Sequence, residues 1–271
     1  MYSNATESPD SATRSSQGSL DSGLDNTLEG NSDKIKLLTA ELRSGSFKKR
    51  IQAVHNLAAL GTAEADQALV ESLQSGGKID PNDSYANDQI AVYGSSYQYL
   101  FKATSAVAKS FTEQTPTGLV KVISEREVDY DELQQLLIQQ NYQAADKLTT
   151  ELMCEIAGET AIQRKWVYFT EISQFPDADI LTIDTLWRTY SENKFGWSQQ
   201  RALWLRLGQD WERLWPQINW KSSAGAWTRY PTEFTWDLAS APIGHLPLFN
   251  QLRGVRVMNA LLEHPVWSRT D

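Results

Sequence analysis

The sequence is poor in cysteine and in positive charge, and it lacks a long apolar run. Its single cysteine, Cys154, excludes an intrachain disulfide and disfavours a cysteine-based zinc site. Lysine and arginine total 25 against 34 aspartates and glutamates, which gives a net charge of −9. Proteins that bind nucleic acid or dock on anionic membranes usually carry a basic surface, so neither function is expected. No apolar stretch approaches the ~20 residues that span a bilayer.

Tryptophan, by contrast, is abundant and unevenly placed. The chain has 10 tryptophans, the first of which is Trp166, so all of them lie in the C-terminal part. Several must belong to the core, where large rings bury much apolar area. Tryptophan is also favoured where an apolar surface meets a polar or mobile partner, so we expect some of these rings to line a binding surface.

The N-terminal part of the sequence predicts a tail followed by helices. Residues 1–31 are rich in serine, aspartate and threonine, and we expect a disordered tail because they bury too little surface to offset their ordering entropy. Acidic residues in this tail are unlike a transit peptide, so we expect a protein of a prokaryotic cytoplasm. Residues 32–127 predict a helical bundle that serves as a scaffold or partner surface. It includes a HEAT-like helix pair joined by Gly61 and one long helix over 87–111.

Residues 128–271 predict a second, all-helical domain with one long irregular stretch. Apolar positions at helical spacing indicate helices near 131–137, 145–156, 183–190, 198–205 and 211–215. Cys154 lies within one of these apolar stripes and is expected to be structural. The segment 219–246 has no sustained period, and a loop of that length inside a compact domain is usually functional. His245 is expected to order this loop rather than to ligate a metal.

A further helix is predicted to start at Pro247, because proline suits the first turn, where a missing N–H costs nothing. One face of this helix carries apolar residues for the core, and another carries Phe249, Arg253 and Arg256. Two guanidinium groups one turn apart, beside an aromatic ring, suit an anionic ligand with a flat apolar body. Spacing alone leaves open the alternative of two solvated arginines on an outer face.

Ten short motifs from the second domain resemble the genomes-uncoupled-four family, whose members are tetrapyrrole-binding regulators of chlorophyll synthesis. The motifs are WVYFTE at 166–171, FP at 175–176, IDTLW at 183–187, YS at 190–191, KFG at 194–196, WTRYP at 227–231, FTWDL at 234–238, AP at 241–242, GHLPL at 244–248 and NQLRGVR at 250–256. The resemblance covers roughly residues 130–267, and the first domain resembles the extra bundle of cyanobacterial members. One departure is FGWSQQ at 195–200, where the family usually has Phe-Gly-Phe-Ser-Val-Gln.

The resemblance implies an all-α core with a concave, aromatic-lined surface that binds protoporphyrin IX and its magnesium complex. It further implies a non-catalytic monomer that stimulates magnesium chelatase through the large porphyrin-binding subunit of that enzyme. The implied location is the cyanobacterial cytoplasm, with peripheral thylakoid association through partners. No resident metal or covalently bound cofactor is implied.

A porphyrin is a flat apolar disc with two propionates at one edge, and this shape assigns roles to residues of the resembling segments. We expect Arg253 and Arg256 to bind the propionates, with Arg229 as a third cation. Asn250 and Gln251 could bond propionates or a metal-bound water. The candidate walls are Phe195, Trp197, Trp227, Tyr230 and Phe249. We expect Trp211, Trp215 and Trp236 to belong to the core instead.

Two other classes of function remain open on the residues alone. An enzyme acting on a tetrapyrrole would need a nucleophile–base pair or paired carboxylates in its cleft, and the sequence offers no obvious pair. A helical scaffold without direct ligand binding would use the aromatic residues only as core. Absence of porphyrin binding would favour the scaffold.

Overall fold

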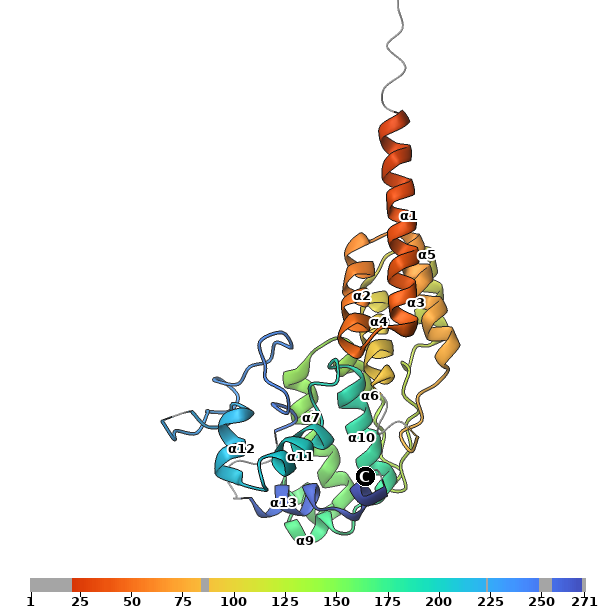
Figure 1. The fold of residues 1–271 in the computed structure, drawn as a ribbon. Helices are drawn as coiled ribbons and strands as arrows, with labels where there is room; N and C mark the ends of the chain where they lie inside the picture. The colour runs from red at the N-terminus through yellow and green to blue at the C-terminus, as the bar shows by residue number, and fades with distance from the viewer. Residues whose placement is uncertain (1–20, 84–87, 223, 249–254, 270–271) are drawn as a thin grey trace, which may run out of the picture.

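Five helices form the N-terminal bundle of the computed structural model, which describes residues 21–83, 88–222, 224–248 and 255–269 (Figure 1). They are α1 (Asp21–Ser44), α2 (Phe47–Leu60), α3 (Ala63–Gly76), α4 (Gln89–Lys102) and α5 (Ala106–Gln114). Local signals set several of their ends. Gly61 closes α2 with a left-handed backbone, and the Thr62 side chain accepts a hydrogen bond from the N–H of Ala65 to open α3.

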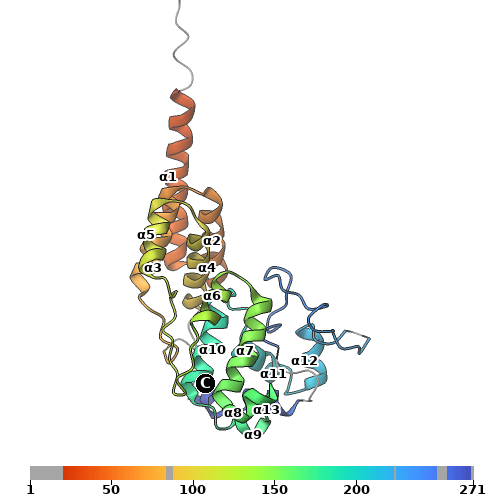
Figure 2. The ribbon, with the colours of Figure 1, turned by 180° about the vertical axis from the view of Figure 1, so that it is seen from behind.

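Two predictions for the bundle need correction. The tail predicted over residues 1–31 includes the start of α1, which begins at Asp21 and extends beyond the other bundle helices (Figures 1 and 2). No proline lies between residues 10 and 31 to block a helix, and the buried Leu38 and Leu42 anchor its later turns on α2. The long helix predicted over 87–111 is wrong as well. The chain is extended at Ala103, and Ser105 caps a new helix by accepting from the N–H of Ala108.

The C-terminal part is built around a helix that is buried on nearly all sides. This helix, α10 (Asp177–Thr189), has every residue from Ala178 to Thr189 buried. Its large apolar side chains alternate with buried polar ones, among them Asp179, Asp184 and Arg188. The other elements of this part are α6 (Asp131–Ile138), α7 (Tyr142–Ala157), α8 (Glu159–Arg164), α9 (Phe169–Ile172), α11 (Trp197–Arg206), α12 (Trp211–Gln217), α13 (Arg256–Leu262) and the 3-10 helix η2 (Pro265–Arg269). The regular secondary structure of the described residues is thus all helical, as predicted, with two isolated bridges and no strand.

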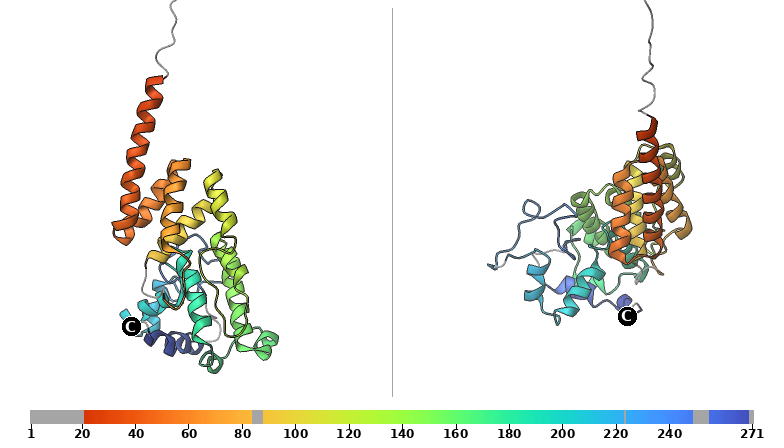
Figure 3. Two further views of the ribbon diagram at one scale, coloured as in Figure 1. Left: turned by 90° about the vertical axis from the view of Figure 1, so that its right-hand side faces the viewer. Right: turned by 45° about the horizontal axis from the view of Figure 1, so that its top comes forward.

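The bundle and the C-terminal part share one continuous hydrophobic core, and α4 connects them (Figure 3). Gly94 of α4 lies directly against the backbone of Thr189 at the end of α10. One turn further along α4, the buried amide of Gln98 donates hydrogen bonds to the carbonyls of Leu137 and Tyr190, each at 2.8 Å. The division predicted near residue 128 therefore separates two parts that are packed and hydrogen-bonded together.

The irregular segment predicted over 219–246 carries no helix in its described residues, and it is ordered by the side chain of His245, as predicted. The Nδ1 of this ring lies 2.7 Å from the carbonyl of Ile218, and its Nε2 accepts from the N–H of Thr235 at 3.2 Å. The indole of Trp220 donates to the His245 carbonyl at 2.8 Å. Burial lowers the pKa of His245, which keeps the ring neutral and able to accept at Nε2.

The helix predicted to start at Pro247 does not start there. Pro247 follows a cis peptide bond and lies outside any helix, and α13 begins only at Arg256. Side chains from other helices bind the backbone at this point: Gln200 donates to the Pro247 carbonyl at 2.8 Å, and Asp146 accepts from the N–H of Leu248. These tertiary contacts outweigh the local signal of proline at a helix start. Residues 249–254 lie outside the described residues.

Candidate functional site

A stack of tryptophan rings supports the exposed ring of Trp227. The ring centroids of Trp204 and Trp211 are 4.9 Å apart, those of Trp211 and Trp215 are 5.1 Å apart, and those of Trp215 and Trp220 are 5.7 Å apart. Trp227 lies 5.7 Å from Trp215 and is 46% exposed, whereas Trp215 and Trp220 are buried. Trp215 is therefore core, as predicted, and Trp227 presents a large aromatic surface on a rigid base.

A second aromatic cluster supports the exposed ring of Tyr230. Tyr230 contacts Phe234 and Trp236 in edge-to-face geometry, with centroid distances of 5.6 and 5.9 Å. Phe234 packs in turn on the buried ring of His245 at 5.0 Å. Tyr230 is 41% exposed, so one face of its ring remains open to a ligand. Trp236, predicted to belong to the core, is half-buried: it packs against the core and donates its indole N–H to the Pro231 carbonyl.

A buried carboxylate on α7 binds the chain just after Pro247. Asp146 accepts a hydrogen bond from the backbone N–H of Leu248 at 2.6 Å. Burial raises the pKa of Asp146 to about 7, and the Leu248 N–H and the nearby Tyr230 side chain limit that rise because they stabilise the charged form. The carboxylate thereby fixes the backbone at Leu248 relative to α7.

Arg256 lies on a different aromatic surface, formed where α9 and α13 run side by side at the end of the molecule away from the bundle (Figure 1). It is exposed in the first turn of α13, and its guanidinium lies 5.6 Å from the centroid of Phe169. Nearby on the chain, the guanidinium of Arg164 lies 4.6 Å from the ring of Trp166 and 4.1 Å from that of Tyr168. Phe169 and Tyr168 are 40% and 44% exposed. The Arg164 guanidinium is paired with the Glu171 carboxylate at 2.6 Å, so a flat anionic ligand on this surface would meet Arg256 and the exposed ring of Phe169.

Sequence reasoning did not assign the rings of this α9–α13 surface to the site. Tyr168 and Phe169 belong to the WVYFTE segment, which was among the motifs that resemble the family. Two adjacent aromatics at the start of the four-residue helix α9 were a signal in the sequence, but only the fold brings α9 beside α13, about ninety residues later in the chain.

Two of the predicted walls lie in the core of the protein. Phe195 and Trp197 are both fully buried. Phe195 packs edge-on against Tyr142 at 5.3 Å and contacts Trp187 at 6.2 Å. Trp197 is the first residue of α11. Gly196, just before it, has a backbone φ of 125°, and a Cβ at this position would collide with the Asp184 carboxylate. In this structure neither ring presents a surface to a ligand, contrary to the wall role predicted for them, because other side chains enclose both.

Arg229, the third predicted cation, is paired with a carboxylate of its own loop. Its guanidinium contacts Glu233 at 2.6 Å, its backbone N–H donates to the same carboxylate at 2.9 Å, and its side chain is 81% exposed. A propionate would have to compete with Glu233 for this arginine. The other predicted ligands, Phe249, Asn250, Gln251 and Arg253, lie outside the described residues.

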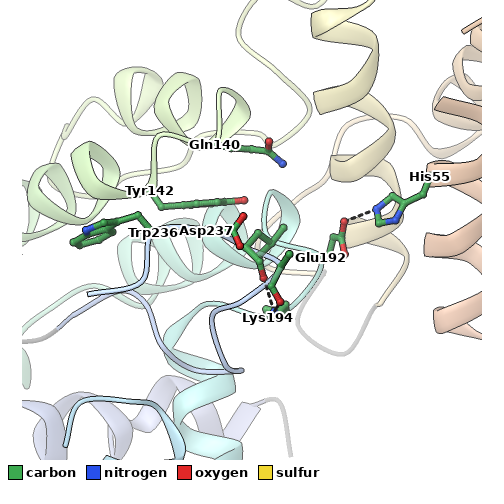
Figure 4. Close-up of a pocket in the computed structure, with 9 residues that line it drawn as sticks. His55, Gln140, Tyr142, Glu192, Lys194, Trp236 and Asp237 are labelled. Carbon is green, nitrogen blue, oxygen red and sulfur yellow. Dashed lines mark hydrogen bonds and ion pairs between the residues drawn. The ribbon is translucent and has the colours of Figure 1, made fainter. Parts of the chain in front are cut away.

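A cavity of about 830 Å³ lies between the bundle and the C-terminal loop, and none of the six predicted site residues in the described part of the chain lines it (Figure 4). The His55 ring of α2 contacts the Glu192 carboxylate at 2.7 Å on one side of it, and Lys194 donates to the carbonyl of Leu238 at 2.5 Å on the other. The lining residues are His55, Gln140, Tyr142, Glu192, Lys194, Trp236, Asp237, Leu238 and Ala239. The lining is mixed: Glu192, Lys194 and Asp237 bring charges of both signs close to apolar side chains such as Trp236, whereas a porphyrin needs broad apolar walls.

The described residues were also searched for a metal site, a reactive cysteine and a membrane-spanning helix. They contain no group of three or more histidines, cysteines, aspartates and glutamates placed to hold a metal ion. Cys154 is buried on α7, and burial raises the pKa of its thiol, so it packs as a structural residue, as predicted. Within the described part of the chain, every helix is too short or too polar to cross a membrane.

Comparison with known proteins agrees with the fold and the motifs. The GUN4-like family model matches residues 123–265. A Ycf53-like protein from Synechocystis sp. is 42% identical over 239 residues, which cover 88% of this chain and 98% of that protein. The chloroplastic tetrapyrrole-binding protein of Arabidopsis thaliana is 35% identical over 149 residues, 52% of this chain and 56% of that protein. The structure of GUN4 from Chlamydomonas reinhardtii superposes with a TM-score of 0.51 at 36% identity, covering 55% of this chain and 95% of that one. These matches confirm the resemblance seen in the sequence motifs, and the chain belongs to the GUN4-like family.

Proposed function

We propose that this protein binds protoporphyrin IX and magnesium protoporphyrin IX without converting them, and that it stimulates magnesium chelatase. Membership of the GUN4-like family supports the proposal, as does the name of the Arabidopsis relative, a tetrapyrrole-binding protein. The observation that carries it is the pair of exposed rings, Trp227 and Tyr230, each held on its own rigid aromatic cluster. Exposed aromatic faces held in place in this way suit a flat apolar ligand, because little side-chain entropy is lost on binding.

The propionates supply the second part of the recognition. A guanidinium binds a carboxylate through two parallel hydrogen bonds, and arginine is the side chain best suited to this geometry. Arg253 and Arg256 are the proposed partners, with Arg229 available if a propionate displaces Glu233. Asn250 and Gln251 are proposed to add hydrogen bonds to a propionate or to a metal-bound water.

Arg256 already lies over the ring of Phe169, so its guanidinium is next to an apolar surface. Phe169 and Phe249 are proposed to contact the disc near its charged edge. Phe195 and Trp197 contribute as buried supports of the loops, because their rings are enclosed by other side chains.

The proposed partner is the large porphyrin-binding subunit of magnesium chelatase, to which the protein would deliver substrate or from which it would carry product. Such a role needs reversible binding, which suits a site made of aromatic surfaces and arginines. We propose that the protein works as a monomer in the cytoplasm of a cyanobacterium and reaches thylakoid membranes only through its partners.

The test is an equilibrium titration with magnesium deuteroporphyrin IX, a water-soluble analogue, of wild-type protein and of the double variant Arg253→Ala/Arg256→Ala. Each lost charge-assisted hydrogen bond is worth about 1.5–3 kcal/mol, so the double variant should bind at least tenfold more weakly. The matched control is Arg43→Ala/Arg126→Ala, which removes the same charge at exposed positions in α1 and in the loop before α6. The control should bind as wild type does.

Magnesium chelatase activity, measured with and without the added protein, tests the second half of the proposal. Stimulation by wild type and by the control, but not by the double variant at limiting porphyrin, is the expected result. Unchanged porphyrin affinity in a folded double variant would remove the proposed propionate role. Absence of stimulation by a wild-type protein that binds porphyrin would remove the chelatase role and leave the binding.

A further inference from the structure

We infer that Lys221 binds a propionate of the porphyrin at the edge of the Trp227 ring, and that it thereby selects tetrapyrroles with free carboxylates. The inference rests on the proposed function, because it adds a cation to that same site. Lys221 belongs to none of the ten family motifs and lies near the start of the irregular loop, six residues before Trp227.

The backbone holds Lys221 and Trp227 opposite each other. The two residues form an isolated antiparallel bridge, and next to it the Thr228 N–H donates to the carbonyl of Trp220 at 3.0 Å. Trp220 is buried, and its indole donates to the His245 carbonyl at 2.8 Å, so this turn is anchored to the core. Lys221 therefore has a fixed backbone position beside the exposed ring.

The Lys221 side chain extends from this position to the aromatic ring. Its ammonium nitrogen lies 5.3 Å from the centroid of Trp227, which is within the range of a cation–π contact. The lysine side chain is only 18% exposed. Because it is already ordered, it loses less conformational entropy on binding an anion than a mobile surface lysine would lose.

The carboxylate that pairs with this ammonium comes from α12. Lys221 donates to Glu212 at 2.5 Å. An ammonium has three N–H donors, so within the described part of the chain two of them stay available to a ligand. The Glu212 side chain is 72% exposed, and exposed ion pairs contribute little to stability, so a propionate can also replace it at low cost.

Lys221 is better placed for this role than Arg229 of the same loop. The Arg229 side chain is 81% exposed, and Glu233 accepts from both its guanidinium and its backbone N–H. A propionate would have to break that two-point contact and order a mobile side chain. At Lys221 neither cost applies in full, because the side chain is ordered and its partner takes one donor.

The position of the ammonium also orients the ligand. A disc that packs on Trp227 brings part of its rim to Lys221. An apolar rim there would remove a charge from water without giving it a partner, which is unfavourable. A propionate supplies the opposite charge, and charge-assisted hydrogen bonds are roughly twice as strong as neutral ones. The carboxylate-bearing edge of the disc is therefore the edge that faces Lys221.

The experiment compares two ligands, magnesium deuteroporphyrin IX and its diamide, in which both propionates are uncharged. Equilibrium titrations are made of wild type, Lys221→Met, Lys221→Arg and Glu212→Gln, with the fold of each checked by circular dichroism. The matched controls are Lys109→Met and Glu113→Gln, which make the same charge changes at exposed positions of α5, in the bundle and away from α12 (Figure 1).

The expected results differ in sign between the variants. Lys221→Met keeps the apolar stem and loses the ammonium, so it should bind the dicarboxylate about tenfold more weakly and the diamide as wild type does. Lys221→Arg keeps the charge and should stay within about threefold of wild type. Glu212→Gln removes the competing carboxylate and should bind the dicarboxylate about threefold more tightly. Both controls should bind as wild type does.

The outcomes that overturn the inference are distinct from those that overturn the proposed function. Lys221→Met that binds the dicarboxylate as wild type does, or that weakens both ligands equally, would remove the propionate contact and leave porphyrin binding in place. Weaker binding by Glu212→Gln would show that the ion pair only holds Trp227, and it would overturn the contact even if Lys221→Met folds poorly. Wild type that binds neither ligand would overturn the proposed function as well.

Discussion

Replacing Gly94 by alanine would add a methyl group where α4 lies directly on the end of α10. A Cβ at this position would be 1.9 Å from the carbonyl oxygen of Thr189 and 2.5 Å from its carbonyl carbon. Both atoms belong to the backbone of a buried helix, so no side chain can turn aside to make room. The two helices would have to separate, and with them the bundle and the C-terminal part.

The size of the effect follows from two opposing terms. Extra atoms in a packed core cost about 1–3 kcal/mol, and the backbone clash places Gly94→Ala at the upper end of that range. Alanine regains about 1 kcal/mol over glycine through helix propensity. The free energy of unfolding should therefore fall by about 2 kcal/mol, which corresponds to a decrease in Tm of roughly 4–8 °C in a chain of this size.

Urea unfolding followed by circular dichroism measures this loss, and Gly76→Ala is the matched control. A Cβ at Gly76, the last residue of α3, would be 2.3 Å from the ring of Tyr93, a side chain that can rotate. The control should change stability by less than about 1 kcal/mol in either direction. A Gly94→Ala protein as stable as wild type would refute the claim that the α4–α10 contact is tightly packed.

Three further predictions concern single residues. Asp179→Ala should lower the free energy of unfolding by at least about 3 kcal/mol in urea titrations. The reason is that the buried carboxylate accepts hydrogen bonds from Ser124, the Glu125 N–H and Tyr130. A smaller loss would mean that water replaces the carboxylate as the acceptor. Burial lowers the pKa of His245 below its usual 6.5, so the unfolded chain binds more protons and stability is lost as the pH falls below about 6.5. His245→Gln should flatten that loss between pH 7 and pH 5, and an unchanged slope would contradict the assignment. Trp227→Ala should weaken porphyrin binding several-fold with little effect on Tm, since the ring is half exposed; equal affinity would exclude it from the site.

Element ends that depend on local chemistry could be predicted from the sequence. Gly61 closes α2 with a left-handed backbone, and Gly158 follows the last residue of α7, both at the predicted positions. The sequence does not predict the break between α4 and α5, because neither Ala103 nor Ser105 is a strong signal for the end of a helix. Ser105 is a good cap for the start of the next helix, α5.

The position of Pro247 could not be predicted from its neighbours in the sequence. Its local context favours a helix start, but Gln200 and Asp146 bind the backbone of residues 247 and 248 from two other helices. Contacts between segments far apart in the chain decide whether a helix starts at Pro247, and hydrophobic periodicity cannot predict such contacts.

Which aromatic rings are exposed could not be predicted from the sequence either. The sequence around Phe195 and Trp197 resembles an exposed turn, yet both rings are fully buried and Trp197 begins α11. Trp227 and Tyr230, which were also predicted as walls, are exposed. Periodicity cannot distinguish these pairs, because none of the four rings belongs to a long amphipathic helix with a clear outer face.

The most direct test of porphyrin binding is a fluorescence titration of the purified protein with deuteroporphyrin IX, with and without magnesium, in which tryptophan quenching is followed. The stack that ends at Trp227 places several indoles beside the proposed site, so a bound porphyrin should quench them strongly. Saturable quenching at micromolar or lower concentrations, tighter for the magnesium form, is the predicted result. Quenching that never saturates would contradict ligand binding and would favour a helical scaffold whose aromatic rings serve only packing and protein contacts.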